Sequence, residues 1–182
     1  MNRRLAQGFQ GDPPKTEYPA TVAVVALGAN LGDRAATIDD ALRDLGRMPL
    51  TTEIRAAAPI ESVAVKPEGP DAEAPAYLNT VALVTTRLAP SVLLGYLHAI
   101  EARHGRERRE RWGDRTLDLD LVAYGEVRSA DPALLLPHPR AAERDFVLAP
   151  WLVVDPDAEL VGVGRVDDLL AALRAEVPED ES

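Results

Sequence analysis

The residues best suited to chemistry lie in one stretch, Gly105 to Tyr124. Its second half, residues 116–124, predicts a β-strand because apolar and polar residues alternate with a period of two. The alternation directs Leu117, Leu119, Leu121 and Ala123 to one face and Thr116, Asp118, Asp120, Val122 and Tyr124 to the other. Asp118 and Asp120 then lie about 6.5–7 Å apart along the strand. Two such carboxylates repel each other unless a cation lies between them, and Mg²⁺ prefers oxygen ligands of this kind.

The first half of the stretch is rich in positive charge. It contains Arg106, Arg108, Arg109, Arg111 and Arg115, with Trp112 among them. These charges fit no amphipathic pattern, so residues 106–115 are expected to form a solvated loop. Guanidinium groups can bind phosphate oxygens through two hydrogen bonds at once. A metal-binding carboxylate pair beside such a loop suits transfer from a nucleoside triphosphate. A half-exposed strand after a charged turn explains the same residues without any function, and both interpretations stay open at this point.

Four sequence blocks resemble one known family. Residues 111–120, RWGDRTLDLD, are similar to the signature of the 6-hydroxymethyl-7,8-dihydropterin pyrophosphokinases, which usually reads RWGPRTLDLD. Three further blocks follow the family's order, at residues 25–32 (VALGANLG), 77–79 (YLN) and 136–146 (LPHPR, then ERDF). Asp114 stands where the signature has proline, which removes rigidity in φ beside Arg115. Together the blocks fall within residues 22–155, so chance agreement is a poor explanation.

The resemblance implies an ATP-dependent diphosphotransferase of folate biosynthesis. The family transfers pyrophosphate from ATP to 6-hydroxymethyl-7,8-dihydropterin and releases AMP, as the substrate's hydroxymethyl oxygen attacks the ATP β-phosphorus. By resemblance, Asp118 and Asp120 hold two Mg²⁺ ions, and Arg106 and Arg115 are catalytic. The resemblance assigns contacts with ATP to Arg108, Arg111, His138 and Arg144.

The resemblance also implies a pterin site. Tyr77 and Phe146 match the two aromatic residues that sandwich the pterin ring, although each alone is more typical of a core residue. Asn79, whose amide both donates and accepts hydrogen bonds, matches a contact with the pterin edge; alone it is typical of a strand end. Trp112 matches a residue that helps to close the loop over substrates. Ser62, Val63 and Val65 correspond by position to a segment that contacts the pterin.

Composition narrows the function classes. The chain has 182 residues and no cysteine, which excludes disulfides and thiolate metal sites. Its net charge of −10 argues against a general nucleic-acid binder. No apolar run approaches membrane-spanning length, and the first residues lack the apolar core of a signal peptide, so a cytoplasmic protein is expected. We also expect a monomer. The alternatives are a non-catalytic ferredoxin-like module that binds nucleotide or RNA through the arginines and Trp112, and a degenerate family member with a scaffolding role. Mg²⁺-independent ligand binding would favour the binding module.

The remaining pattern predicts one α+β domain over residues 21–176, after a disordered leader (1–20) and before an acidic tail (177–182). Strands are expected at 21–27, 51–60 and 77–87, with a further short strand at 151–154. Helices are expected at 34–45, 90–103 and 166–173. A turn is expected at 28–32, and loops are expected at 62–76 and at 126–150, the second with a helical turn near Ala141. Asp33 is the expected N-cap and Gly46 the C-terminal stop of the first helix, and His98 and His104 are expected on the surface. This order is that of a ferredoxin-like βαββαβ core with a small, mainly antiparallel sheet and helices packed on it. The resemblance implies that the helices lie on one side of that sheet.

Overall fold

The computed structural model describes residues 19–62, 64–66, 69–71, 76–105 and 116–175. Its main sheet has the strand order β2–β6–β1–β7, and all neighbouring pairs are antiparallel. The strands are β1 (Thr21–Ala29), β2 (Thr51–Ala56), β6 (Tyr77–Thr86) and β7 (Asp118–Tyr124), with β3 (Ile60–Ser62) also paired to β6. With α1 (Arg34–Gly46) between β1 and β2, and α2 (Pro90–Arg103) between β6 and β7, this is the predicted βαββαβ core.

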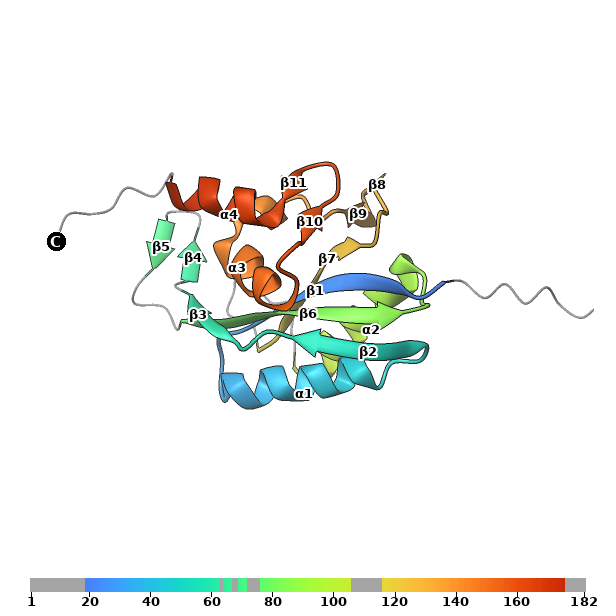
Figure 1. Cartoon of the computed structure of the whole chain (residues 1–182). Helices are drawn as coiled ribbons and strands as arrows, with labels where there is room; N and C mark the ends of the chain where they lie inside the picture. Colours follow the sequence, from blue (N-terminus) through green and yellow to red (C-terminus); the bar gives the residue numbers. More distant parts are fainter. Residues whose placement is uncertain (1–18, 63, 67–68, 72–75, 106–115, 176–182) are drawn as a thin grey trace, which may run out of the picture.

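Helices cover both faces of the sheet (Figure 1). On the first face, α1 and α2 bury their apolar residues against the strands, as the resemblance implies. On the second face lie α3 (Asp145–Val154) and α4 (Val166–Ala175). The expectation of helices on one side is therefore wrong for the whole chain, because it describes only the βαββαβ core.

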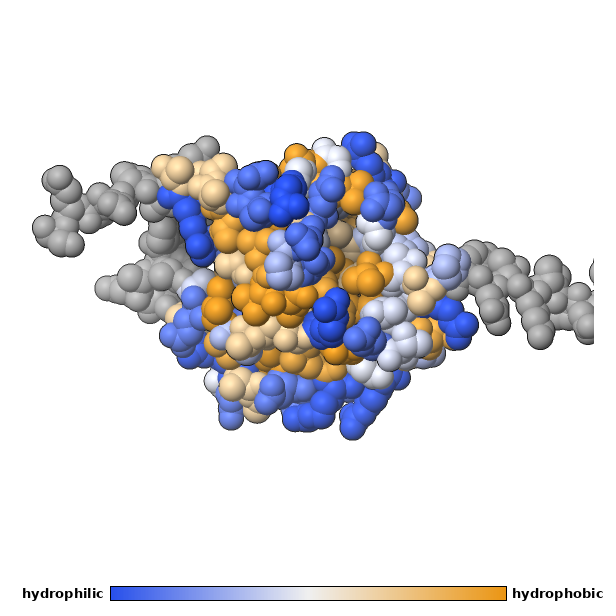
Figure 2. Space-filling view, viewed as in Figure 1, coloured by the Kyte–Doolittle hydropathy of each residue, from blue (hydrophilic) through white to orange (hydrophobic). Residues whose placement is uncertain are grey.

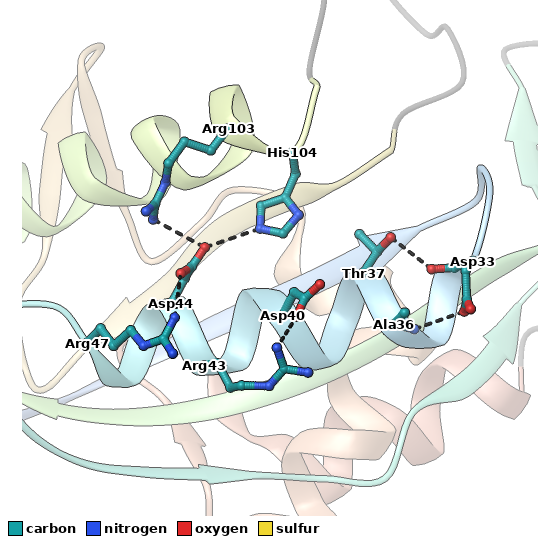
Figure 3. Close-up of polar contacts among 9 residues, drawn as sticks. All are labelled: Asp33, Ala36, Thr37, Asp40, Arg43, Asp44, Arg47, Arg103 and His104. Atoms are coloured by element: carbon teal, nitrogen blue, oxygen red, sulfur yellow. Dashed lines mark hydrogen bonds and ion pairs between the residues drawn. The ribbon is translucent and has the colours of Figure 1, made fainter.

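The first face is a closed apolar layer. Ile38, Ala41 and Leu45 of α1 are fully buried, as are Leu93 and Leu97 of α2. Both helices begin where the sequence predicts, α2 with Pro90 in its first turn. α1 begins at its Asp33 cap, where the carboxylate accepts a hydrogen bond from the Ala36 N–H at 3.0 Å (Figure 3).

The end of α1 differs from the prediction. Gly46 is still part of the helix, and the capping residue Arg47 has a right-handed φ of −91°. The helix therefore ends without the left-handed glycine that the sequence suggested.

The second face is closed by a helix that the sequence did not predict. Residues 145–154 form α3, where a loop and a short strand were expected. Pro150 favours a loop. The buried residues Val147, Leu148 and Trp151 favour a helix and prevail, because Leu148 and Trp151 lie one and four residues after Val147. Figure 2 shows apolar surface in the middle of the view, where Figure 1 places α3 and the neighbouring strands, and Val153 of α3 is 71% exposed.

The predicted alternation of β7 holds through Val122 and is wrong for Ala123 and Tyr124. The pairing of β1 with β7 shifts register between Val24 and Val25, which leaves one extra residue on β7. As a result Val122 and Ala123 both join the cluster under α3 and α4, and Tyr124 returns to the first face. There its hydroxyl donates a hydrogen bond of 2.6 Å to the Leu88 carbonyl.

Other segments also differ from the predicted bounds. β1 continues through residues 28 and 29, which were expected in a turn, and the strand expected at 51–60 is interrupted at 57–59. The segment expected to be a loop at 62–76 contains the paired strands β4 (Ala64–Lys66) and β5 (Gly69–Asp71). The expected loop at 126–150 contains the hairpin of β8 (Ser129–Asp131) and β9 (Leu134–Leu136), followed by the short helix η1 (Ala141–Glu143) near the predicted Ala141 turn. β10 (Glu159–Leu160) and β11 (Gly164–Arg165) pair just before α4.

Residues 1–18 and 176–182 lie outside the described residues, so the predicted leader, domain bounds and tail stay predictions. Among the helices that the structure describes, none is long and apolar enough to cross a membrane.

Candidate active site

The second face of the sheet becomes polar at one end. Gly28 on β1 pairs with Asn79 on β6 and with Asp118 on β7, so these three residues form one row across the sheet. Paired residues of an antiparallel sheet direct their side chains to the same face. Because Gly28 has no side chain, the Asn79 amide can lie directly over it. A Cβ at Gly28 would lie 2.9 Å from Asn79 Oδ1 and 3.9 Å from Tyr77 Cδ1.

The predicted pterin residues of β3 and β6 lie together. Asn79 is 6% exposed, and its Nδ2 donates a hydrogen bond of 2.7 Å to Ser62 Oγ. Ser62 itself pairs with Tyr77 across β3 and β6. The hydrogen bond leaves Oδ1 as the atom of the amide that faces Gly28. An amide fixed in this way can form hydrogen bonds with the neighbouring donors and acceptors on the edge of a flat heterocycle.

Arg34, which the sequence did not single out, supports this wall of the site. Its Nη1 donates 2.6 Å to the carbonyl of Ala76, the residue before Tyr77. Its Nη2 lies 2.9 Å from Glu61 Oε1, one residue before Ser62. Arg34 thus ties the start of α1 to both strands that carry the polar side chains. The sequence held no signal for this role, since an arginine in the first turn of a helix is an ordinary surface residue.

Asp120 lies one row further along the same face, opposite Ala26. Arg144 Nη1 donates a hydrogen bond of 2.8 Å to its Oδ2, and His138 Nε2 lies 3.9 Å from the same oxygen. Three predicted site residues from separate segments therefore meet at one carboxylate. The guanidinium balances the charge that two neighbouring aspartates would otherwise concentrate here.

His138 is held in a defined orientation. Its backbone N–H donates 2.8 Å to the Val122 carbonyl on β7, and its Nδ1 accepts a hydrogen bond of 3.2 Å from the Arg140 N–H. The proton of the neutral ring is therefore on Nε2, directed toward Asp120. Burial lowers the pKa of His138 below its usual 6.5; Asp120 and Asp118 oppose that shift, while Arg144 and Arg140 reinforce it. The ring is consequently neutral at pH 7 and presents one N–H donor.

Phe146 contacts Arg144, the residue that donates a hydrogen bond to Asp120. The Arg144 guanidinium carbon lies 5.8 Å from the centroid of the Phe146 ring, within the range of a cation–π contact. Phe146 is in the first turn of α3 and partly buried against the cluster of the second face. A core role and a site role are thus both compatible with its position, and the aromatic sandwich stays a prediction.

The arginine segment is anchored beside the aspartates. Arg106, Arg108, Arg111, Trp112 and Arg115 lie outside the described residues, as does Val63, and Val65 is described only as backbone of β4. Both ends of the segment are described. A Cβ on Gly105, with φ of +80°, would lie 4.0 Å from Thr116 Oγ1. The segment therefore leaves and rejoins the fold at one point, two residues before Asp118.

His104 lies at that point and is not the surface residue that was expected. Its side chain is 17% exposed, and Nε2 lies 3.2 Å from Asp44 Oδ2 on α1. Arg103 Nη2 lies 3.2 Å from the same oxygen, so α2 ends clamped to α1 (Figure 3). The sequence could not reveal this contact because it joins residues 60 positions apart. His98 is exposed, as predicted.

The acidic residues could hold a divalent cation. Within the described part of the chain, no group of three or more histidines and acids could hold a metal ion. The fold then offers Asp118 and Asp120, and the other ligands have to be phosphate oxygens and water. That donor set fits Mg²⁺, which is usually bound through one or two carboxylates together with substrate phosphates.

The chain is similar to known proteins over most of its length. Residues 24–156 match the family model of 7,8-dihydro-6-hydroxymethylpterin-pyrophosphokinase (HPPK). A 2-amino-4-hydroxy-6-hydroxymethyldihydropteridine pyrophosphokinase of Pseudomonas aeruginosa is 42% identical over 148 residues, covering 81% of this chain and 89% of that protein. The protein of the same name from Methylorubrum extorquens is 37% identical over 153 residues, covering 84% of this chain and 94% of that protein.

Solved structures agree on the fold. Plasmodium falciparum HPPK-DHPS, wild type with pteroate, superposes with a TM-score of 0.65 at 12% identity, covering 88% of this chain. The chain spans 46% of the length of that solved chain. At this identity the likeness supports the ferredoxin-like α+β fold alone, and the functional family follows from the sequence matches. The chain belongs to the 7,8-dihydro-6-hydroxymethylpterin pyrophosphokinase family and is an ATP-dependent pyrophosphokinase of folate biosynthesis.

Proposed function

We propose that the polar end of the second sheet face is where pyrophosphate passes from ATP to 6-hydroxymethyl-7,8-dihydropterin. The observation that carries this proposal is the row Asn79–Gly28–Asp118, in which a fixed amide and a carboxylate share one face of the sheet on the two strands that flank a glycine. The amide suits the edge of the pterin ring, and the carboxylate suits the cations that accompany a triphosphate. The row therefore holds both substrates side by side.

In this proposal Asp118 and Asp120 would hold two Mg²⁺ ions together with phosphate oxygens. When bound, the ions would screen the charge of the triphosphate and stabilise the attacking and leaving oxygens. Asn79 and Ser62 orient the pterin, with Tyr77 and Phe146 on its two faces. His138, a neutral donor, and Arg144, which both contact Asp120 in the structure, would donate hydrogen bonds to the phosphates. The hydroxymethyl oxygen then attacks the β-phosphorus, and AMP leaves.

The arginines outside the described residues complete the proposal. Their segment joins the fold two residues before Asp118, which supports roles for Arg106 and Arg115 at the transferred phosphates and for Arg108 and Arg111 along ATP. Trp112, in the same segment, would help to exclude water. Positioning and charge stabilisation supply most of the rate in such transfers.

We also propose that the enzyme works as a monomer in the cytoplasm. ATP is plentiful there, and both apolar clusters of the described chain are closed by its own helices. Light scattering on the purified protein tests the oligomeric state. The non-catalytic binding module gains no support from the comparisons.

The decisive experiment identifies the nucleotide product. Purified protein is mixed with ATP, Mg²⁺ and 6-hydroxymethyl-7,8-dihydropterin, and the products are separated by chromatography. AMP formed together with the pterin diphosphate, and lost in Asp118→Asn, is expected. Asp39→Asn, the same chemical change on the exposed side of α1, is the matched control and should retain activity. Formation of ADP, or full activity in Asp118→Asn, would contradict the proposal.

A further inference from the structure

A buried carboxylate lies behind the aspartate pair. Glu101, in the last turn of α2, is 1% exposed and lies on the helix face that also carries Leu93 and Leu97. Acidic side chains are almost never fully buried unless polar partners compensate for the lost hydration. The sequence contained a signal for this residue, because its spacing of four from Leu97 and eight from Leu93 places an acid on an apolar helix face.

One compensating contact is with the strand that carries the aspartates. Glu101 Oε1 accepts a hydrogen bond of 2.9 Å from the backbone N–H of Leu119. Leu119 lies between Asp118 and Asp120, and β7 is the last strand of its side of the sheet. The carboxylate therefore takes the place of a neighbouring strand for this one N–H group. Bonds from a charged acceptor to a backbone N–H are stronger than bonds between neutral groups.

Glu101 holds the strand without joining the site. The Leu119 side chain packs in the cluster under α1 and α2, whereas the neighbouring aspartates point to the second face. Fixing the peptide between the two aspartates fixes the directions in which both Cα–Cβ bonds leave the strand. A pair of metal ligands needs this, because Mg²⁺ demands near-ideal octahedral geometry.

We propose that Glu101 is a positioning residue that sets the affinity of the Asp118–Asp120 pair for divalent cations. This inference rests on the proposed role of the two aspartates as metal ligands. Glu101 touches neither cation nor substrate, so its loss acts on metal affinity. Excess metal should therefore restore much of the turnover.

The test compares Glu101→Gln with Glu101→Leu. The glutamine keeps a carbonyl oxygen that can accept the Leu119 N–H, while the leucine keeps an apolar side chain of similar size without an acceptor. Mn²⁺ binding, in the presence of α,β-methylene-ATP, is measured by electron paramagnetic resonance, which does not depend on turnover. Because outer partners of metal ligands typically contribute tenfold or more in affinity, Glu101→Leu should weaken binding roughly tenfold. Glu101→Gln should stay close to the wild type. Glu101→Ala replaces the leucine variant, with the same expected result, if the latter does not fold.

Leu93→Ala is the matched control. Leu93 is fully buried on the same face of α2, two turns before Glu101, so its truncation loosens the helix without removing the acceptor. Equal weakening in Leu93→Ala, wild-type affinity in Glu101→Leu, or a loss in Glu101→Gln as large as in Glu101→Leu would each overturn the inference. Wild-type Mn²⁺ affinity in Asp118→Asn would instead remove the proposed metal site itself, so the two failures are distinguishable.

Discussion

The two faces of the main sheet are built from the same strands but end differently. On the first face Leu27, Leu119 and their neighbours continue an apolar layer along the strands, and α1 and α2 cover it. On the second face the apolar layer under α3 and α4 includes Val81 and then changes to polar side chains at Asn79 and Asp118. Neighbouring residues of one strand thus belong either to the apolar core or to the proposed site, because alternation sends them to opposite faces. Substitutions on the two faces should therefore have separable effects.

The largest effect is expected on the polar end. Asp120→Asn should lower turnover on the order of a thousandfold, because metal-assisted charge stabilisation contributes several kcal/mol to such a transfer. The melting temperature should stay close to the wild-type value, because the carboxylate is partly exposed and Asn keeps its size. AMP release and thermal unfolding, measured on the same sample, check the prediction. A comparable fall in melting temperature would mean that the two faces are not separable.

The opposite result is expected on the apolar face. Leu97→Ala removes a fully buried side chain of α2 and should lower the free energy of unfolding by about 2–5 kcal/mol. Turnover per folded molecule should change little at temperatures where the protein remains folded. Urea unfolding followed by circular dichroism, combined with an activity assay at low temperature, measures both quantities. A large loss of turnover in fully folded protein would contradict the prediction that the two faces have separable effects.

A smaller and more selective effect is expected at the glycine between the amide and the carboxylate. In Gly28→Ala the new Cβ would lie 2.9 Å from Asn79 Oδ1, so the amide has to move. The KM for the pterin should rise roughly tenfold, because one misfit in a polar contact is worth one or a few kcal/mol. The KM for ATP should change much less.

Gly95→Ala is the control for this substitution. Gly95 lies on the exposed side of α2, and a Cβ there meets no described atom within 4 Å. It should leave both KM values unchanged and stabilise the protein by about 0.5–1 kcal/mol, since alanine is the better helix former. An equal rise in both KM values of Gly28→Ala would show that the glycine acts on the whole site.

The smallest effect sharpens the comparison on the apolar face. Tyr124→Phe removes the hydroxyl that donates 2.6 Å to the Leu88 carbonyl, which is buried. The free energy of unfolding should fall by about 1 kcal/mol, the usual net contribution of such a bond. Kinetic constants should not change, although Tyr124 belongs to the strand that carries both aspartates. Chemical unfolding alongside steady-state kinetics decides this.

Periodicity predicted most of the core. The helices at 34–45 and 90–103 and the long strands were expected nearly where they are, because their apolar residues recur at helical or strand spacing. Failures arose where an element depends on its partner. The bulge in β7 follows from its register with Val24 and Val25, which no local pattern contains. α3 was missed because Pro150 is a local signal, whereas the burial that outweighs it is tertiary.

In the candidate site, too, some residues were predicted from the sequence and others were missed. Asp120, His138 and Arg144 were named from sequence blocks, and the structure shows that they meet at one oxygen. Arg34 was missed because it acts through the backbone carbonyl of Ala76. The position of Glu101 on an apolar helix face was a signal in the sequence, but its partner, the backbone N–H of Leu119, could not be predicted. Backbone contacts of that kind depend on the fold rather than on residue type.

The adjacent ends of the arginine segment have a consequence for engineering the chain. Because Gly105 and Thr116 lie side by side, the ten residues between them can be exchanged, lengthened or cut to a short turn without stretching α2 or β7. Loop closure changes by only about 0.6 kcal/mol for each doubling of length. The segment is therefore a place where the chain can change in length and sequence while α2 and β7 keep their positions.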